Sequence, residues 1–215
     1  MKKTFILLSV SFLLVSLTYL PCKAQETKQM RFGIKGGLNI ANLYTSDAKS
    51  SDMLIGFNVG VFDKMPVSNF FTIQPELYIT TKGATVNYNN LLINGSAKFN
   101  LTYIELPILF VANVNDLFNV QFGPYVAYLV DGTVKNQSNL GIFDFEKNIN
   151  IDNYNRIDAG VVVGAGLDFG AISLGARFNL GLTKVGKTQT ILGTSYTVPN
   201  ATNGVINFYL AIALN

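Results

Sequence analysis

Seven charged residues could act together in this chain, and their types decide what chemistry is open to them. They are Lys35, Glu76, Glu105, Arg156, Asp158, Asp168 and Arg177. Two carboxylates such as Glu76 and Glu105 could serve as a general acid and base. Charges in a low-dielectric interior need partners, so we interpret the seven as a salt-bridged structural cluster instead. We expect Glu76 and Glu105 to lie near Lys35 or Arg177.

Other catalytic or ligand-binding chemistry is nearly absent from the sequence. The chain has no His, which excludes Ser-His-Asp and Cys-His catalysis and His-ligated metal sites. Its only cysteine is Cys22, which excludes a zinc ribbon or a disulfide framework. The Gly164-Ala-Gly166 stretch lies in a strand pattern with no helix after it, so it is no dinucleotide fingerprint. We therefore expect no enzyme activity, no cofactor and no metal.

The first 24 residues have the pattern of a secretory signal peptide. Lys2 and Lys3 precede an apolar run at 5–20, and small residues before position 25 suit cleavage after Ala24. An N-terminal membrane anchor is the alternative, but the run is short and Pro21 closes it. Residues 25–215 then form the single domain of the mature chain, with 13 basic and 13 acidic side chains. This zero net charge leaves no basic footprint for nucleic acid.

Alternation with period two appears in eight segments of the remaining chain, which predicts eight strands. They are approximately residues 32–40, 55–62, 70–80, 103–110, 118–130, 156–168, 172–183 and 206–214. Their apolar faces hold 42 residues without a single charge, and the opposite faces are rich in Gly and small polar residues. A soluble barrel would turn large aliphatic residues inward and charges to water. The reverse arrangement, with aliphatic residues facing lipid, suits a membrane-spanning barrel.

The connections alternate in length as they do in outer-membrane barrels, where short turns face the periplasm. The long ones are expected at 42–53, 82–98, 131–155 and 184–204, and the short ones at 63–69, 113–116 and 170–171. Phe32, Phe71, Phe118 and Phe169 fall at the short-turn ends, which predicts a periplasmic aromatic girdle. Lipid offers no partner for free backbone groups, so the sheet must close on itself. The fold class expected is all-β: an eight-stranded antiparallel up-and-down transmembrane barrel.

An ordered set of short motifs carries a family resemblance over the whole domain. The motifs are Phe32-Gly-Ile-Lys-Gly-Gly-Leu-Asn-Ile40, Tyr103-Ile-Glu-Leu-Pro107, Phe122-Gly-Pro-Tyr-Val126 and Asp158-Ala-Gly160. The chain resembles the PorT-like outer-membrane β-barrel family of Bacteroidota, often labelled a porin family. The resemblance implies an eight-stranded outer-membrane barrel but not one activity. The end, Ala213-Leu214-Asn215, departs from the terminal aromatic residue common in such barrels.

Three functions remain open on this reading. The favoured one is a non-enzymatic barrel in the outer membrane of a Gram-negative bacterium, with a lumen filled by side chains and four long external loops. Its expected partners are membrane lipid, the barrel-assembly machinery, and an envelope or secretion protein at the loops. The alternatives are a narrow small-solute channel and a soluble periplasmic ligand-binding barrel. A measurement of conductance would distinguish the channel from a closed barrel. Apolar residues on the inner face would indicate the soluble barrel.

Overall fold

The computed structural model describes residues 29–45, 52–89, 94–138, 145–191, 194–198 and 200–214, most of them in strands. The predicted signal peptide, residues 1–24, lies outside these ranges. The elements are β1 (Arg31–Thr45), β2 (Leu54–Pro66), β3 (Phe71–Asn89), β4 (Asn94–Asn113), β5 (Phe118–Ser138), β6 (Phe145–Asn148), the 3-10 turn η2 (Ile151–Asn153), β7 (Ile157–Phe169), β8 (Ile172–Lys184), β9 (Lys187–Ile191), β10 (Thr194–Val198) and β11 (Ala201–Ala213). No helix among the described residues is long and apolar enough to cross a membrane.

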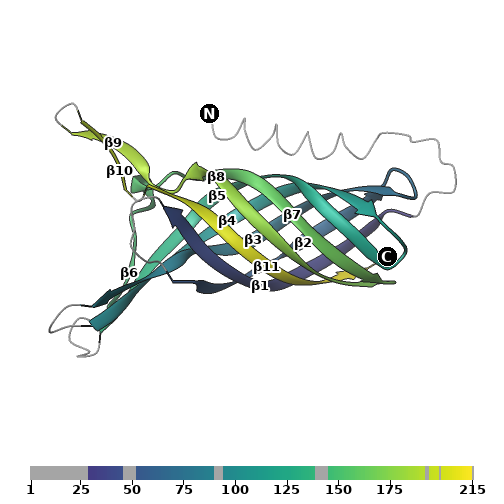
Figure 1. Ribbon diagram of the computed structural model, residues 1–215, viewed down its shortest axis with the longest axis horizontal. Helices are drawn as coiled ribbons and strands as arrows, with labels where there is room; N and C mark the ends of the chain where they lie inside the picture. The colour runs from purple at the N-terminus through teal and green to yellow at the C-terminus, as the bar shows by residue number, and fades with distance from the viewer. Residues whose placement is uncertain are drawn as a thin grey trace, which may run out of the picture.

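Eight of these strands close into a barrel (Figure 1). Each pairs antiparallel with its neighbours in the order β4-β3-β2-β1-β11-β8-β7-β5, and pairing of β4 with β5 closes the ring. The ladder between β1 and β11 runs from Gly33 opposite Ala213 to Thr45 opposite Ala201, so the first and last strands seal the wall. The predicted eight-stranded antiparallel up-and-down barrel is confirmed.

Side chains alternate between the outside and the lumen along every barrel strand, as the pleat of a strand requires. On β7, for example, Val161 and Val163 are 41% and 55% exposed, whereas Val162 between them is 1% exposed. The buried side chains of the barrel include many that are polar or charged. Large apolar residues therefore face outward, and the soluble ligand-binding alternative, which needs them inside, is wrong.

One end of the barrel has three short turns, at residues 67–70, 114–117 and 170–171, close to the predicted positions. In the tightest turn, Gly170 has φ of 66°, which glycine adopts without strain at the first central position of a two-residue hairpin loop. Since short turns of outer-membrane barrels face the periplasm, we call this the periplasmic end and the other the external end.

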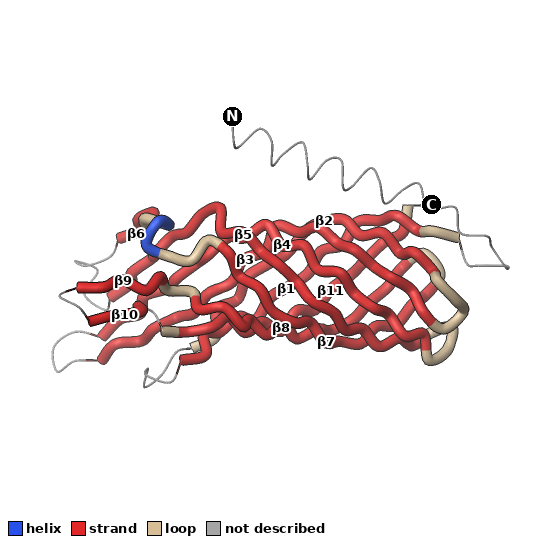
Figure 2. Tube along the Cα trace, turned by 90° about the horizontal axis from the view of Figure 1, so that it is seen from above, coloured by secondary structure: helices blue, strands red, loops and turns tan. Residues whose placement is uncertain are grey.

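At the external end, the connections are shorter than expected because the strands continue into the residues that were predicted to form loops. β3 runs to Asn89 and β4 starts at Asn94, so residues 82–98 are mostly hairpin and not loop. β5 likewise continues to Ser138, and β6 pairs with its residues from Thr133 to Asn136. The register of β4 against β5 shifts between Thr102 and Tyr103 as the sheet leaves the barrel. Figure 2 shows β6 and the β9–β10 hairpin beyond the external rim.

Candidate functional site

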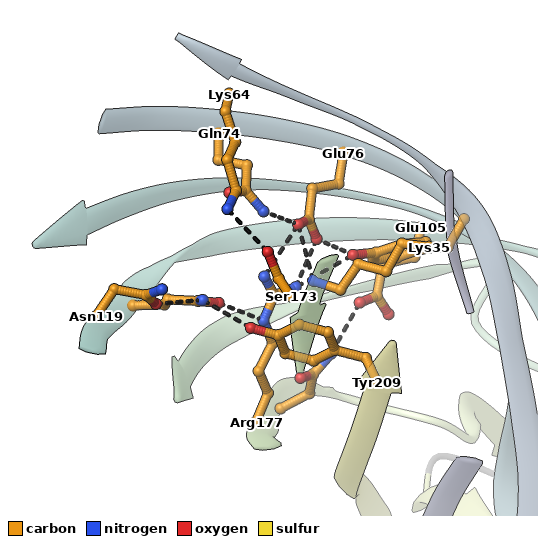
Figure 3. A network of polar contacts seen from close by, with 12 residues as sticks. Lys35, Lys64, Gln74, Glu76, Glu105, Asn119, Ser173, Arg177 and Tyr209 are labelled. Atoms are coloured by element: carbon orange, nitrogen blue, oxygen red, sulfur yellow. Dashed lines mark hydrogen bonds and ion pairs between the residues drawn. The ribbon is translucent and has the colours of Figure 1, made fainter. Parts of the chain in front are cut away.

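The middle of the lumen holds an ion-pair cluster centred on Glu76 of β3, which is 3% exposed. Arg177 of β8 binds its carboxylate with both terminal nitrogens, at 2.6 Å from Nη1 to Oε2 and 3.0 Å from Nη2 to Oε1. Lys35 of β1 lies 3.1 Å from Oε1 through its Nζ, and Gln74 and Tyr78 also donate hydrogen bonds to the carboxylate. Figure 3 shows these side chains converging from different strands. We call Lys35, Glu76 and Arg177 the Glu76 cluster.

The two cations of the Glu76 cluster are also held by neutral side chains. The Nζ of Lys35 lies 3.6 Å from the ring centroid of Tyr209, and the guanidinium carbon of Arg177 lies 4.7 Å from the same centroid. The Nε of Arg177 donates to Gln121 at 2.7 Å. Cation–π contacts and charge-assisted hydrogen bonds of this kind compensate part of the cost of burying two cations beside one carboxylate.

A second cluster lies nearer the external end and is centred on Lys82 of β3, which is 1% exposed. Its Nζ lies 2.6 Å from Oε2 of Glu105 on β4 and 2.8 Å from Oδ2 of Asp158 on β7. The ring of Tyr125 faces the same ammonium at 4.3 Å, and its hydroxyl donates to Asp158 at 3.2 Å. We call Lys82, Glu105 and Asp158 the Lys82 cluster.

The two clusters carry opposite net charge. The Glu76 cluster has two cations and one carboxylate, and the Lys82 cluster has one cation and two carboxylates. Between them is a cavity of about 10 Å³, lined in part by Tyr78, Arg177, Lys82 and Glu105. A cavity of this size has room for about one water molecule. The lumen is therefore polarised along its axis but neutral across the two clusters together.

Glycines on the barrel wall make room for the lumen side chains. A Cβ atom at Gly166 would lie 2.6 Å from the hydroxyl of Tyr209, and one at Gly160 would lie 2.7 Å from the ring of Tyr125. A Cβ at Gly164 would lie 2.6 Å from Cγ of Arg177. Real Cβ atoms do not approach other atoms so closely. The large lumen side chains therefore fit at these points only because the wall residue is glycine and has no side chain. The Gly-rich inner face noted in the sequence thus receives the residues that fill the lumen.

At the periplasmic end, one ion pair spans the barrel mouth. The Nζ of Lys64 on β2 lies 2.7 Å from Oδ1 of Asp168 on β7, and these strands are four places apart in the ring of eight. Ser173 and Asn119 also donate to Asp168. Arg31 makes a parallel link, donating from Nη1 to the carbonyl of Gly170 at 2.7 Å.

The predicted cluster differs from this arrangement at two places. Glu105 does not join Lys35 or Arg177, because Lys82 holds it. Arg156 does not point into the lumen. It precedes the first residue of β7 and pairs with Asp152 at 2.6 Å, outside the barrel strands. Hydrogen bonds with Asp152 and Tyr128 raise the pKa of this guanidinium.

Sequence reasoning missed Lys64 and Lys82 because both were assigned to connections. The period-two pattern, continued two residues past Glu76, Tyr78 and Thr80, would have placed Lys82 on the inner face. Glu76 and Glu105 occupy different clusters, each engaged by its own cations, so the suggested acid–base pair does not face a shared substrate space. No group of three or more potential metal ligands occurs among the described residues.

The four predicted girdle residues lie close to the periplasmic turns. Phe32, the second residue of β1, is 47% exposed, and Phe71, the first residue of β3, is 51% exposed. Phe169, the last residue of β7, is 53% exposed. Phe118 begins β5 and is half-buried. Their common level and outward direction are what an interfacial belt requires, and the girdle remains a proposal.

A closed antiparallel barrel with large apolar residues exposed along its outer face and a polar lumen defines a transmembrane β-barrel of the outer-membrane type. The chain belongs to the family described as outer membrane protein beta-barrel domain, whose pattern matches residues 23–186. It is accordingly an integral protein of the outer membrane, in contact with membrane lipid.

Among solved structures, the fold is similar to Ail, the attachment invasion locus protein of Yersinia pestis. That match has 14% identity and a TM-score of 0.46, and it covers 87% of this chain and 100% of Ail. Neisserial surface protein A matches at 14% identity and a TM-score of 0.45, covering 86% of this chain and 99% of that one. No curated protein sequence matches the chain.

Proposed function

We propose that this protein is a non-enzymatic outer-membrane barrel, closed to solutes by its own side chains, that displays its external strands and loops to other molecules. The observation that carries the proposal is the pair of ion-pair clusters stacked along the lumen. Lys35, Glu76 and Arg177 join three strands across the interior, and Lys82 joins β3 to β4 and β7 a little further out. A solute would have to separate both clusters to pass.

The size of the barrel supports closure. Open porin channels are formed by 16–18 strands, whereas eight strands leave an interior just wide enough for side chains to fill. Tyr103 is fully buried, and Tyr78, Tyr125 and Tyr209 are each at most 6% exposed. The cavity between the clusters has room for about one water, which is far less than a sugar or an amino acid needs.

An apolar seal above the Lys82 cluster supports the same proposal. Leu101, Leu129 and Val185 form a buried cluster against which Ile149 and Ile151 of the β6–β7 connection pack. The Ile149 amide donates to the Gly132 carbonyl at 3.0 Å, which ties this connection to β5. The external mouth is therefore covered by chain in addition to the ion pairs beneath it.

The test is conductance of the purified protein in planar bilayers. We expect no stable single-channel steps, and no swelling of protein-containing liposomes in small sugars. Reproducible conductance that changes in Glu76→Gln or Glu105→Gln would overturn the proposal and favour the narrow small-solute channel.

The finer assignments belong to the same proposal. We assign the chain to the PorT-like members of its family on the motifs of β1, β4, β5 and β7. We also propose insertion by the barrel-assembly machinery and an envelope or secretion partner at the external loops. A pull-down from intact membranes, comparing the protein with a variant whose external loops are shortened, tests the loop partner directly.

A further inference from the structure

Two of the three periplasmic turns share one sequence pattern and lie side by side. The β2–β3 turn reads Val67-Ser-Asn-Phe-Phe71, and the β4–β5 turn reads Val114-Asn-Asp-Leu-Phe118. In both turns the first and fourth residues are apolar, the second and third are polar, and the fifth is a Phe of the predicted girdle. The turns are neighbours on the rim, because β3 pairs with β4 and the Asn113 amide donates to the Phe70 carbonyl at 2.8 Å.

The apolar first and fourth residues of both turns are exposed. Val67 and Phe70 are 56% and 69% exposed, and Val114 and Leu117 are 61% and 44% exposed. None of the four lines the cavity of about 220 Å³ inside the periplasmic mouth, where Arg31 lies. We call these four side chains the apolar turn surface. Exposed apolar groups that gather in this way mark a contact with protein or with membrane.

The backbone of each turn satisfies its own hydrogen-bond donors. The amides of Val67 and Ser68 donate to the Phe71 carbonyl at 2.8 and 3.0 Å. The Ser68 Oγ then accepts from the amides of Phe70 and Phe71 at 3.3 and 3.1 Å. The β4–β5 turn repeats this arrangement, with Asn115 Oδ1 accepting from the next two strandward amides at 2.9 and 2.7 Å. Internal satisfaction of this kind is what lipid demands of a backbone, since lipid offers no partner.

The third turn is of a different kind. It consists of two small residues, Gly170 and Ala171, both of them exposed. The Gly170 carbonyl accepts from the exposed guanidinium of Arg31 at 2.7 Å. This turn lies four places around the ring of eight strands from the β2–β3 turn. One side of the periplasmic rim is therefore apolar, and the opposite side is small and polar.

We propose that the β2–β3 and β4–β5 turns are embedded in the inner leaflet of the outer membrane, whereas the β7–β8 turn lies in the periplasmic water. The contact is phospholipid because the apolar turn surface continues the lipid-facing wall: Phe70 and Leu117 each precede the first residue of a barrel strand. The polar second and third residues of each turn then lie among the headgroups. The embedded turns hold one side of the rim in the bilayer, which fixes the depth and tilt of the barrel.

The experiment uses the whole protein, isotope-labelled and held in phospholipid nanodiscs with no other protein present. Broadening of methyl NMR signals is measured with two paramagnetic probes. One is a phospholipid with a nitroxide near the headgroup end of an acyl chain, and the other is a water-soluble gadolinium chelate. We expect the lipid probe to broaden the signals of Val67, Val114 and Leu117 at least threefold more than that of Ala171. The chelate should show the reverse order.

Equal broadening of all three turns by the chelate would overturn the proposal. The apolar turn surface would then be in water, which would favour a periplasmic protein as its contact.

Variants test whether the apolar side chains hold the turns in the lipid. Phe70→Ser combined with Leu117→Ser should raise the broadening of the Val67 and Val114 signals by the chelate at least twofold. Ala171→Ser, the matched control in the third turn, should leave those signals unchanged. If the double variant does not fold, Phe70→Ser alone is measured at the Val67 methyl groups. Unchanged accessibility in these variants would overturn the assigned role of the apolar turn surface.

Discussion

Glu76 is the residue on which the lumen depends most, because two buried cations share its carboxylate. Glu76→Gln keeps the shape but leaves Lys35 and Arg177 without a counter-charge. Removing one partner of a buried pair costs roughly 3–5 kcal/mol. We expect a loss of this size in the free energy of unfolding, followed by circular dichroism and gel migration in urea, since the chain has no Trp to report by fluorescence.

A surface pair provides the matched control. Lys135 and Glu146 lie 3.6 Å apart with side chains 46% and 63% exposed. Exposed pairs contribute about 0–1 kcal/mol, so Lys135→Gln should leave stability nearly unchanged. Arg177→Met should be costly as well, because Glu76 then has Lys35 alone. Equal stability of wild type, Glu76→Gln and Arg177→Met would show that the ion pairs are not structural.

At the scale of the strand, the outward face is tested by placing one charge at two depths. Val163 lies on the outward face at the middle of β7, level with Phe178, and Leu182 lies four residues beyond Phe178 near the external end of β8. An Arg at mid-membrane costs about 2–4 kcal/mol, falling to about 0–1 kcal/mol near the interface. We expect Val163→Arg to be markedly less stable in vesicles than Leu182→Arg. Similar costs at both positions would contradict the assigned depth.

The strands also show how far the sequence alone could reach. Alternation predicts all eight barrel strands and their outward faces, because lipid requires an apolar residue at every second position. That requirement ends where the strand leaves the bilayer, so the apolar outward face ends at Ile79 although β3 continues to Asn89. The ion pair between Glu105 and Lys82 could not be predicted either. The register between strands decides which inward side chains come into contact, and the alternation pattern does not contain the register. The prediction that Arg156 faces the lumen is wrong because Arg156 lies one residue before β7, where side chains no longer alternate.

The whole molecule should behave as a closed barrel in detergent. A ring in which β1 pairs with β11 has no free edge, so opening it requires the loss of an entire ladder. We expect the folded protein to resist SDS at room temperature and to migrate differently after boiling. Carbonate or urea should not extract it from membranes. Release by either reagent without detergent would be incompatible with an integral barrel.

The length of the outer hairpins has a consequence for what can touch this protein on a living cell. β5 has 21 residues, and about 9–11 suffice to cross a bilayer. At about 3.4 Å per residue and a tilt of about 40°, the remainder rises on the order of 25 Å above the membrane. Antibodies raised against the β3–β4 hairpin tip should therefore stain intact cells. A short foreign epitope inserted between Asn89 and Asn94 would be carried clear of the lipid surface, which suits this barrel to use as a display scaffold.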